Sequence, residues 1–519
     1  MTSAVDAASS EEGTAARTRR LTASPLVAFL VFAPLLGAIQ LSIPDLAGVD
    51  AYHHLKVAQL LGREEISPVF RWTAESTWAT AHADKDLLLH ALLVPFVRIG
   101  ERYDAVVAMG KLAGTLLAAG VMAVFVRLLA GAGVAHPLWW AMLLIAGAPS
   151  FTGRLSLVRP HLLGIALSLG TLDAMWRGRR VQLFVCALVY PVAYTASHTA
   201  LAMAALVAIG RAAFARAWSP VPLVLVPVGL ALGFVAHPHF PLNVESWWAQ
   251  NVRVPALADQ APALMRKPAE LGPFDSDLLV REDQVLSVAW FLCLALALAR
   301  PRPVGADTQD AFLLASAFGV MTLLATRFLE YWAPYTVIFA ALVWRDLIAR
   351  APDPGWRTVW ARRLALPLVV VLLPFGVARC VGVLRQLSGR NEGYAAVARL
   401  IDSAHRPRAT RVFHSSWGLY PGLFFHDHHS TYLVGLDPAY FYLASPDRFR
   451  RWREVCEGRV ERPAEVIARE FLATWIVSES GPLEAALARE GVATLVGTVS
   501  IPRPGGLAAE RLKVYRIGD

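Results

Sequence analysis

Long apolar runs separated by short polar loops make up most of the chain as far as about residue 383. A helix that spans a bilayer needs about 20 predominantly apolar residues, so these runs predict about eleven spans. The predicted spans cover roughly 25–43, 104–128, 137–152, 159–176, 181–196, 198–213, 219–236, 284–300, 309–326, 332–348 and 364–382. The pattern therefore predicts a mainly α fold, a polytopic transmembrane helix bundle in residues 25–383.

The pattern changes beyond residue 384, where short runs with strand character alternate with helical segments. Strands are predicted at 411–416, 431–435, 474–478, 493–499 and 512–517, and helices at 392–403 and 482–490. This alternation predicts a small C-terminal α/β domain over residues 384–519. An odd number of spans, after a cytoplasmic tail at 1–24, places that domain on the extracytoplasmic side.

Composition agrees with a membrane protein. Hydrophobic residues make up 56% of the chain and charged residues 17%, with a mean hydropathy of +0.46, whereas a soluble domain averages about 25% charged residues. The net charge of +9 comes largely from arginines in short loops on the predicted cytoplasmic side, which is the positive-inside pattern. This distribution excludes nucleic acid as a partner and predicts an integral protein of a bacterial-type inner (plasma) membrane.

Two of the predicted outer loops are large, residues 44–103 and 237–283. The first contains an apolar segment at 86–99, which is expected to lie on the membrane surface as an interfacial helix. The second begins with a histidine-containing and aromatic stretch, where Trp247 and Trp248 are expected to anchor it at the interface.

Asp50 is the leading candidate for catalysis. It begins a run with helical spacing in the first outer loop, and His53 and His54 share its helix face because they follow it by three and four positions. An acid beside an imidazole can form a general base with an orienting partner. Two other interpretations stay open: a helix N-cap, and a site for a divalent ion.

Arginines at the outer ends of the spans form a second constellation. Arg154 and Arg159 lie where the third predicted span meets the fourth, and Arg327 ends the ninth. Arginine forks match phosphate oxygens, and charges at membrane depth are costly enough to suggest function. The alternatives are a snorkelling arginine at Arg159 and an ion pair of Arg327 with Glu330. Substrate-binding candidates are, besides the two histidines, Arg154, Arg159, His161, Arg327, Glu330 and Tyr331.

The segment 49–62, VDAYHHLKVAQLLG, resembles the motif that follows the first span of the GT-C superfamily of membrane glycosyltransferases. Residues 87–129 are similar to the surface helix and second span of its aminoarabinose- and mannose-transferring members. The resemblance implies an inverting transfer of a sugar from a polyprenyl-phosphate-linked donor, with Asp50 as base. The partners it implies are membrane lipid, that donor, and a glycan, lipid or protein acceptor.

The chain departs from the metal-dependent oligosaccharyltransferases of that superfamily. The place of their second acidic pair is held by residues 151–161, FTGRLSLVRPH, which contain no acid. A WWD-type acceptor signature is also missing from the C-terminal domain. No cofactor is therefore indicated, no metal ligand is assigned, and a divalent metal (Mg or Mn) is not favoured.

Two other functions remain open from the sequence. A lipid-linked glycan transporter or flippase would place charges along a path across the membrane, whereas the candidate charges here gather on one side. A non-catalytic scaffold with a GT-C-like body would leave Asp50 as a simple cap. In the C-terminal domain, residues 426–429 (HDHH) look like a metal site, but their spacing fits no regular helix or strand face, and a solvated turn is expected.

Overall fold

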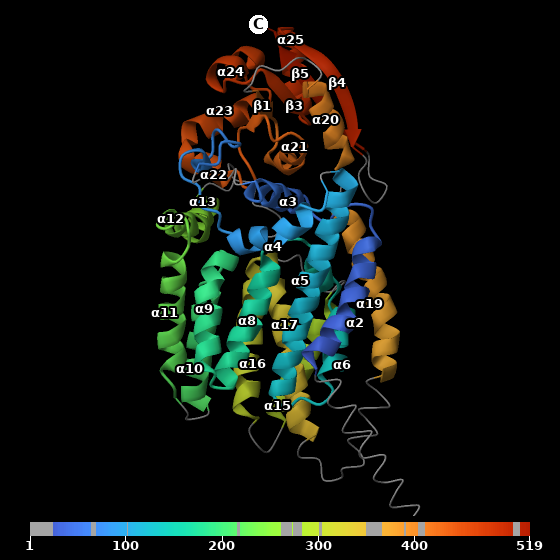
Figure 1. The fold of residues 1–519 in the computed structure, drawn as a ribbon, viewed down its shortest axis with the longest axis vertical. Coiled ribbons are helices and arrows are strands. Elements are labelled where there is room, and N and C mark those ends of the chain that lie inside the picture. The colour runs from blue at the N-terminus through green and yellow to red at the C-terminus, as the bar shows by residue number, and fades with distance from the viewer. Residues whose placement is uncertain are drawn as a thin grey trace, which may run out of the picture.

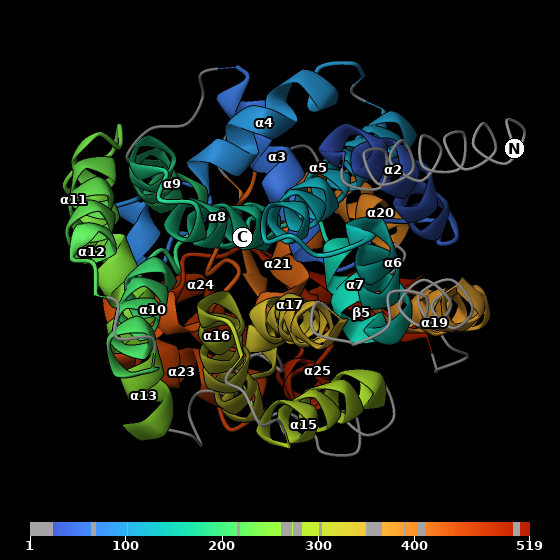
Figure 2. The ribbon, with the colours of Figure 1, turned by 90° about the horizontal axis from the view of Figure 1, so that it is seen from below.

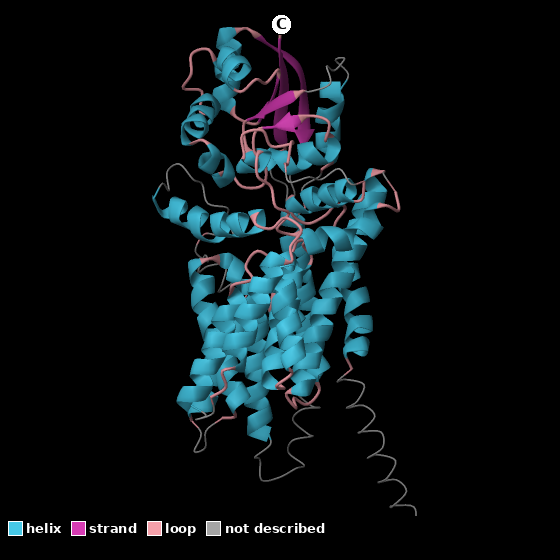
Figure 3. Cartoon of the chain, turned by 60° about the vertical axis from the view of Figure 1, so that its left-hand side comes forward, coloured by secondary structure: helices cyan, strands magenta, loops and turns pink. Residues whose placement is uncertain are grey.

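A computed structural model shows a long helical bundle, a layer of short helices across one of its ends, and an α/β unit above that layer (Figures 1 and 3). The structure describes residues 24–63, 69–100, 102–214, 218–260, 272, 283–299, 304–348, 366–388, 391–402, 410–501 and 509–518. The predicted N-terminal tail and the acid-rich end of the second outer loop lie almost wholly outside these residues.

The bundle helices lie where the apolar runs predicted them. They are α2 (Pro25–Leu41), α5 (Tyr103–Gly131), α6 (Pro137–Gly147), α7 (Pro149–Leu155), α8 (His161–Trp176), α9 (Arg180–Ala193), α10 (Thr199–Phe214), α11 (Val221–Val235), α15 (Gln284–Leu298), α16 (Ala306–Leu324), α17 (Leu329–Ile348) and α19 (Leu366–Leu387). Among the described residues, the stretches Tyr103–Gly131 and Val370–Leu387 are long and apolar enough to cross a membrane, and seven further apolar helices have 10–17 residues. The count of eleven spans therefore stays a prediction.

The third predicted span is two helices rather than one. The break falls at Ala148, whose backbone leaves the helical region at φ −131° and ψ 71°. Pro149 causes it, because a proline disfavours the α conformation in the residue before it and supplies no N–H to the helix. The hydroxyl of Thr152 donates to the carbonyls of Ile145 and Ala148 across the break. This short second helix carries Arg154 to the outer end of the bundle.

The centre of the bundle is α17, which is surrounded by α6, α8, α15 and α16 when seen from below (Figure 2). Nearly every described side chain of α17 is buried, from Leu329 to Val343. Its first turn, preceded by the short helix η4 (Thr326–Phe328), places Glu330 and Tyr331 in the interior at the outer end of the bundle.

The layer above the bundle is built from the two large outer loops. The first loop forms α3 (Asp50–Leu61), η1 (Thr77–Ala79) and α4 (Leu87–Val97), and the second forms α12 (Leu242–Trp248), η2 (Ala249–Arg253) and α13 (Val254–Gln260). The helix predicted within 86–99 is therefore confirmed, and α3 and α4 lie across the bundle axis (Figure 1). Gly48, at φ 76°, supplies the left-handed turn that starts α3.

All five predicted strands are confirmed, although β2 is shorter than expected. They are β1 (Arg411–His414), β2 (Thr431–Tyr432), β3 (Trp475–Ser478), β4 (Ala493–Ile501) and β5 (Glu510–Ile517), in the order β2-β1-β3-β5-β4. The first three are parallel, and β5 pairs antiparallel with β3 and β4. The helices around the sheet are α20 (Glu392–Asp402), η6 (Trp417–Leu419), α21 (Tyr420–His426), α22 (Ala439–Ala444), α23 (Pro446–Cys456), α24 (Pro463–Glu470) and α25 (Gly481–Glu490).

The first outer loop packs into this α/β unit. Thr73 bridges to Tyr432 beyond the edge of β2, so the loop extends the sheet. Glu75 accepts hydrogen bonds from Arg448 at 2.7 Å, and the indole of Trp72 donates to the carbonyl of His428 at 2.6 Å. The loop that carries Asp50 is therefore held between the bundle below and the sheet above.

Asp45 joins three parts of the molecule and is only 5% exposed. Its carboxylate accepts a hydrogen bond from the Tyr103 hydroxyl at 2.5 Å and another from the backbone N–H of Asn391 at 3.2 Å. Tyr103 begins α5, whereas Asn391 directly precedes α20. The side chain therefore ties the outer loop to the bundle and to the start of the α/β unit.

Replacing Asp45 by alanine is expected to lower the free energy of unfolding by about 3 kcal/mol, because a buried donor, the N–H of Asn391, and a partly buried one, the hydroxyl of Tyr103, lose their acceptor. Denaturation of the purified protein in detergent, followed by tryptophan fluorescence, measures the loss. The exposed Asp104→Ala variant is the control, with an expected change within about 0.5 kcal/mol. Equal stability of the two variants would contradict the role given to Asp45.

Candidate functional site

Asp50 and Arg159 form an ion pair at the outer end of the bundle. Asp50 lies in the first turn of α3, and Arg159 lies in the loop between α7 and α8. The N-cap of α3 is Val49, and Asp50 makes no capping hydrogen bond, so the interpretation of Asp50 as a plain cap is wrong. The two side chains remain 25% and 20% exposed, which leaves both the carboxylate and the guanidinium open to a ligand.

The two histidines of α3 point into different surroundings. His53 is buried among aromatic rings of both the loop and the α/β unit, with Phe70, Trp78, Tyr420 and Phe424 at centroid distances of 5.7–6.3 Å. His54 instead places its Nδ1 atom 2.9 Å from the Nε2 atom of His90 in α4. The two rings still touch edge to face, with centroids 5.6 Å apart, and their predicted substrate contacts stay predictions.

A second ion pair lies at the base of the site. The Nε atom of Arg154 donates to Glu330 at 2.9 Å, and Glu330 is only 1% exposed. The carbonyl of Arg154 lies 2.8 Å from the Nε2 atom of His161. A buried carboxylate is costly unless it is paired, so Arg154 satisfies Glu330. Arg327, the partner that the sequence predicts three positions away, also acts on Glu330 through its charge, after Arg154 and His161.

Arg327 and Tyr331 contact tyrosines from the end of α9 and the residue after it. Arg327 donates to the hydroxyl of Tyr194 at 2.8 Å, and that hydroxyl lies 3.5 Å from Glu330. Tyr331 is 2% exposed, with its hydroxyl 3.5 Å from that of Tyr190. Four of the predicted residues, Arg154, His161, Arg327 and Glu330, therefore belong to one connected network, while Tyr331 is packed behind it.

The described residues contain no group of three or more His, Cys, Asp or Glu side chains with a geometry for a metal ion. At Asp50 the neighbouring cation is a guanidinium rather than a set of further oxygen or imidazole donors. In the 426–429 segment, Asp427 accepts hydrogen bonds from Ser430 and from the backbone of His429, which confirms a turn, but Asp427 is only 3% exposed, so the prediction that the turn is solvated is wrong for this acid. These donor sets do not fit a divalent metal.

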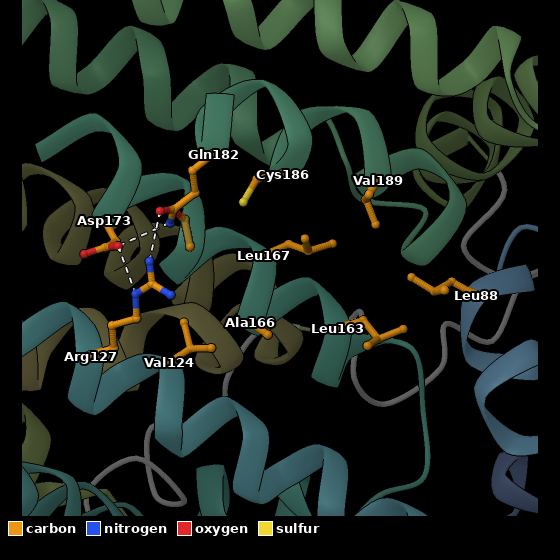
Figure 4. Close-up of a pocket in the computed structure, with 11 residues that line it drawn as sticks. Leu88, Val124, Arg127, Leu163, Ala166, Leu167, Asp173, Gln182, Cys186 and Val189 are labelled. Atoms are coloured by element: carbon orange, nitrogen blue, oxygen red, sulfur yellow. Dashed lines mark hydrogen bonds and ion pairs between the residues drawn. The ribbon is translucent and has the colours of Figure 1, made fainter. Parts of the chain in front are cut away.

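A cavity of about 280 Å³ runs between α5, α8 and α9. Figure 4 shows Leu88 of α4 and Val189 at one end, and Arg127, Asp173 and Gln182 at the other. The walls between are apolar, with Val124, Leu163, Ala166 and Leu167 facing the space. The cavity therefore leads from beneath the outer layer along the length of the bundle.

Sequence reasoning missed Asp84, His90 and Tyr194 as members of this region. All three are buried, and each contacts a predicted residue or its direct partner. The available signal was the pair of acids and the histidine in residues 84–90, DKDLLLH, at the start of the predicted surface helix.

Comparison with solved structures finds similar folds, among them those of two proteins that match over most of this chain. Oligosaccharyltransferase from Archaeoglobus fulgidus, in the apo form, has 13% identity and a TM-score of 0.58, over 92% of this chain and 74% of that one. ArnT from Cupriavidus metallidurans, bound to undecaprenyl phosphate, has 14% identity and a TM-score of 0.58, over 94% and 97% of the two chains. No protein-family model matches the chain, and no curated protein matches its sequence. The chain therefore shares its fold with these two proteins, which agrees with the fold that the resemblance of its first outer loop predicted.

Proposed function

We propose that this protein is a membrane glycosyltransferase that moves a sugar from a polyprenyl-phosphate-linked donor to an acceptor on the extracytoplasmic side. The observation that carries the proposal is the partly exposed Asp50–Arg159 pair at the outer end of a GT-C fold. In a displacement reaction, a carboxylate can accept the proton of the attacking hydroxyl, and a guanidinium beside it can stabilise the charge on the leaving group. The undecaprenyl phosphate bound by ArnT supports a lipid phosphate as the leaving group.

In the proposed reaction the acceptor hydroxyl oxygen attacks the anomeric carbon, and Asp50 takes the hydroxyl proton. The bond between that carbon and the phosphate oxygen breaks, and its electron pair leaves with the lipid phosphate. The guanidinium of Arg159 stabilises the negative charge that develops on the departing oxygen. Attack opposite to the leaving group inverts the configuration at the anomeric carbon. No step uses a metal.

Because Asp50 is paired with Arg159 in the structure, donor binding at Arg159 also affects Asp50. A phosphate carries more acceptor oxygens than a carboxylate and matches an arginine fork. When the donor phosphate binds Arg159, Asp50 loses its partner and becomes available to the acceptor hydroxyl. The base is thus released only when a donor is present, which limits unproductive proton uptake.

The neighbouring network is proposed to hold the rest of the donor. Arg154 and Arg327 lie at the outer ends of α7 and η4, where cations suit a phosphate at the membrane surface. Hydrogen bonds from the interior hold these groups: His161 and Glu330 contact Arg154, and Tyr331 contacts Tyr190. His54 is proposed to face the acceptor, on the same side of α3 as Asp50.

The apolar cavity beneath Leu88 is proposed to take part of the polyprenyl chain. Replacing Ala166 by tryptophan is expected to fill it, and so to raise KM for the donor about 10-fold with little change in kcat, because only ground-state binding is lost. Steady-state kinetics measure the effect. Leu232→Trp, on a 47% exposed position of α11, is the control. A lowered kcat at unchanged KM would contradict this assignment.

The direct test incubates the purified protein with a panel of undecaprenyl-phosphate-linked sugars, each carrying a labelled sugar, and with envelope lipids and glycans as acceptors. We expect label in an acceptor together with released undecaprenyl phosphate. Reconstituted vesicles test the transporter alternative. Label that crosses the membrane while it remains on the lipid would overturn the transferase and favour the flippase.

A further inference from the structure

Three buried side chains from three segments form a continuous hydrogen-bonded chain beneath the candidate site. The Oδ2 atom of Asp84 lies 2.7 Å from the Nδ1 atom of His90, and the Nε2 atom of His90 lies 2.9 Å from the Nδ1 atom of His54. All three residues are at most 4% exposed. The chain therefore leads from a buried carboxylate to the helix that carries Asp50.

The inner end of the chain is rigidly held. The Oδ1 atom of Asp84 accepts from the backbone N–H of Asp86 at 3.1 Å, and its own N–H donates to His239 at 3.0 Å. The Nε2 atom of His237 lies 3.1 Å from its carbonyl. Asp84 is thus fixed by its own loop and by the start of the second outer loop.

The outer end of the hydrogen-bonded chain is His54, which lies on the helix that carries Asp50. His54 follows Asp50 by one helical turn, so the two side chains share a face of α3. His54 uses its Nδ1 atom for His90, which leaves its Nε2 atom for a further partner, and the Arg159 guanidinium that pairs with Asp50 is among the charges that act on its ring. If Asp84 and His90 formed only a structural ion pair, they would not need His54 beside them. A path for protons, by contrast, needs a third group that leads toward the reacting groups.

We propose that Asp84, His90 and His54 form a proton relay that takes the acceptor proton from Asp50, a role that rests on the glycosyl transfer proposed above. In the receptive state, Nδ1–H of His54 donates to Nε2 of His90, and Nδ1–H of His90 donates to Asp84. When Nε2 of His54 takes the proton from Asp50, the Nδ1 proton of His54 moves to His90. The positive charge then lies on His90 beside Asp84. The reverse transfers return the proton to water after the products leave.

The surroundings favour that distribution of charge. Burial lowers the pKa of His90, but the charge and hydrogen bond of Asp84 outweigh burial, so the net pKa is raised. Burial, together with the positive charges of neighbouring groups, holds the pKa of His54 well below its usual value. The other groups that face the two rings are His53, Lys85, Asp86 and Arg159. A proton in the chain therefore rests on His90.

The direction in which activity changes with pH follows from the protonation of His90. The relay accepts a proton only when His90 is neutral, so activity is present above the pKa of His90 and is lost as the pH falls through it. Removing the charge of Asp84 lowers that pKa. The acid limb of the kcat profile then moves to lower pH, while the plateau rate falls because the relay has become a weaker base.

The test compares Asp84→Asn with Asp86→Asn, an equally buried acid of the same loop, which contacts Asp84 and His90 through its backbone rather than through its carboxylate. Deuterium exchange at histidine C2, read by mass spectrometry on the full-length protein without substrate, gives the pKa of each histidine. The kcat profile against pH is measured in parallel. Asp84→Asn should lower the pKa of His90, move the acid limb to lower pH and reduce kcat roughly 10-fold to 100-fold. Asp86→Asn removes a weaker charge and keeps the hydrogen bond between Asp84 and His90, so it should retain the wild-type kcat and move the acid limb less than Asp84→Asn does.

His54→Asn is the second variant, because it removes Nε2 and leaves the Asp84–His90 pair in place. A similar loss of kcat is expected from it. A drop in kcat with an unmoved pH profile for Asp84→Asn, or wild-type kcat in either variant, would overturn the relay. A wild-type protein that is inactive with every donor would instead overturn the glycosyl transfer, and the relay as part of it, whatever the histidine pKa values.

Discussion

Replacing Asp50 by asparagine is expected to reduce sugar transfer by about 1,000-fold or more, because general base catalysis is lost while the shape of the side chain is kept. The protein should still insert and fold. The Asp50–Arg159 pair is partly exposed, and pairs of that kind contribute about 1 kcal/mol or less to stability. Transfer of labelled sugar to acceptor at saturating donor measures the effect.

The control for Asp50→Asn is Asp104→Asn, another outer aspartate in the first turn of a helix, which is exposed and makes no contact with the site. It should turn over like the wild type. Binding of undecaprenyl phosphate to the Asp50→Asn variant should be retained or strengthened, since Arg159 no longer has a competing anion. Turnover near the wild-type rate from Asp50→Asn would exclude Asp50 as the base.

Replacing Arg159 by glutamine is expected to lower kcat by about 100-fold to 1,000-fold, which is the usual loss when one preorganised donor to a developing charge is removed. Affinity for undecaprenyl phosphate should fall as well, because the donor loses a charged contact. Native mass spectrometry of the protein with undecaprenyl phosphate measures binding separately from turnover. Arg159→Lys should recover only part of the rate, since an ammonium keeps the charge but lacks the planar fork.

Arg253→Gln is the matched control for Arg159, since this exposed arginine of η2 belongs to the same outer layer but not to the site. Its binding and turnover should equal those of the wild type. If Arg159→Gln bound undecaprenyl phosphate as tightly as the wild type and kept its kcat, the leaving-group role would have to pass to Arg154 or Arg327.

Much of the fold could be predicted because its signals are local. Apolar runs of near-bilayer length marked the bundle helices, and alternating short runs marked the five strands. The break at Ala148 also has a local cause, Pro149, but the length of the apolar run concealed it. The insertion of residues around Thr73 beside β2 could not be predicted, because it joins segments some 350 residues apart.

The candidate site could likewise be predicted where its signals are local and not where they depend on packing. Helical spacing predicted that His54 would share a face with Asp50, and the topology placed Arg159 on the same side of the membrane as both. Helical spacing alone did not identify two of the partners. Asp86 stands four positions before His90, yet Asp84 is the residue that binds its ring. Glu330 likewise contacts Arg154, from a different helix. At a buried junction, the partner of a side chain depends on how several segments pack together. The periodicity of one segment does not contain that information.

The central claim is that Arg159 exchanges Asp50 for the phosphate of a lipid donor. A cryo-electron microscopy structure of the full-length protein in nanodiscs with undecaprenyl phosphate tests it most directly. We expect the phosphate within hydrogen-bond distance of Arg159, the Asp50–Arg159 pair opened, and the first part of the lipid chain in the cavity beneath Leu88. A phosphate bound elsewhere, with the Asp50–Arg159 pair intact, would contradict the account.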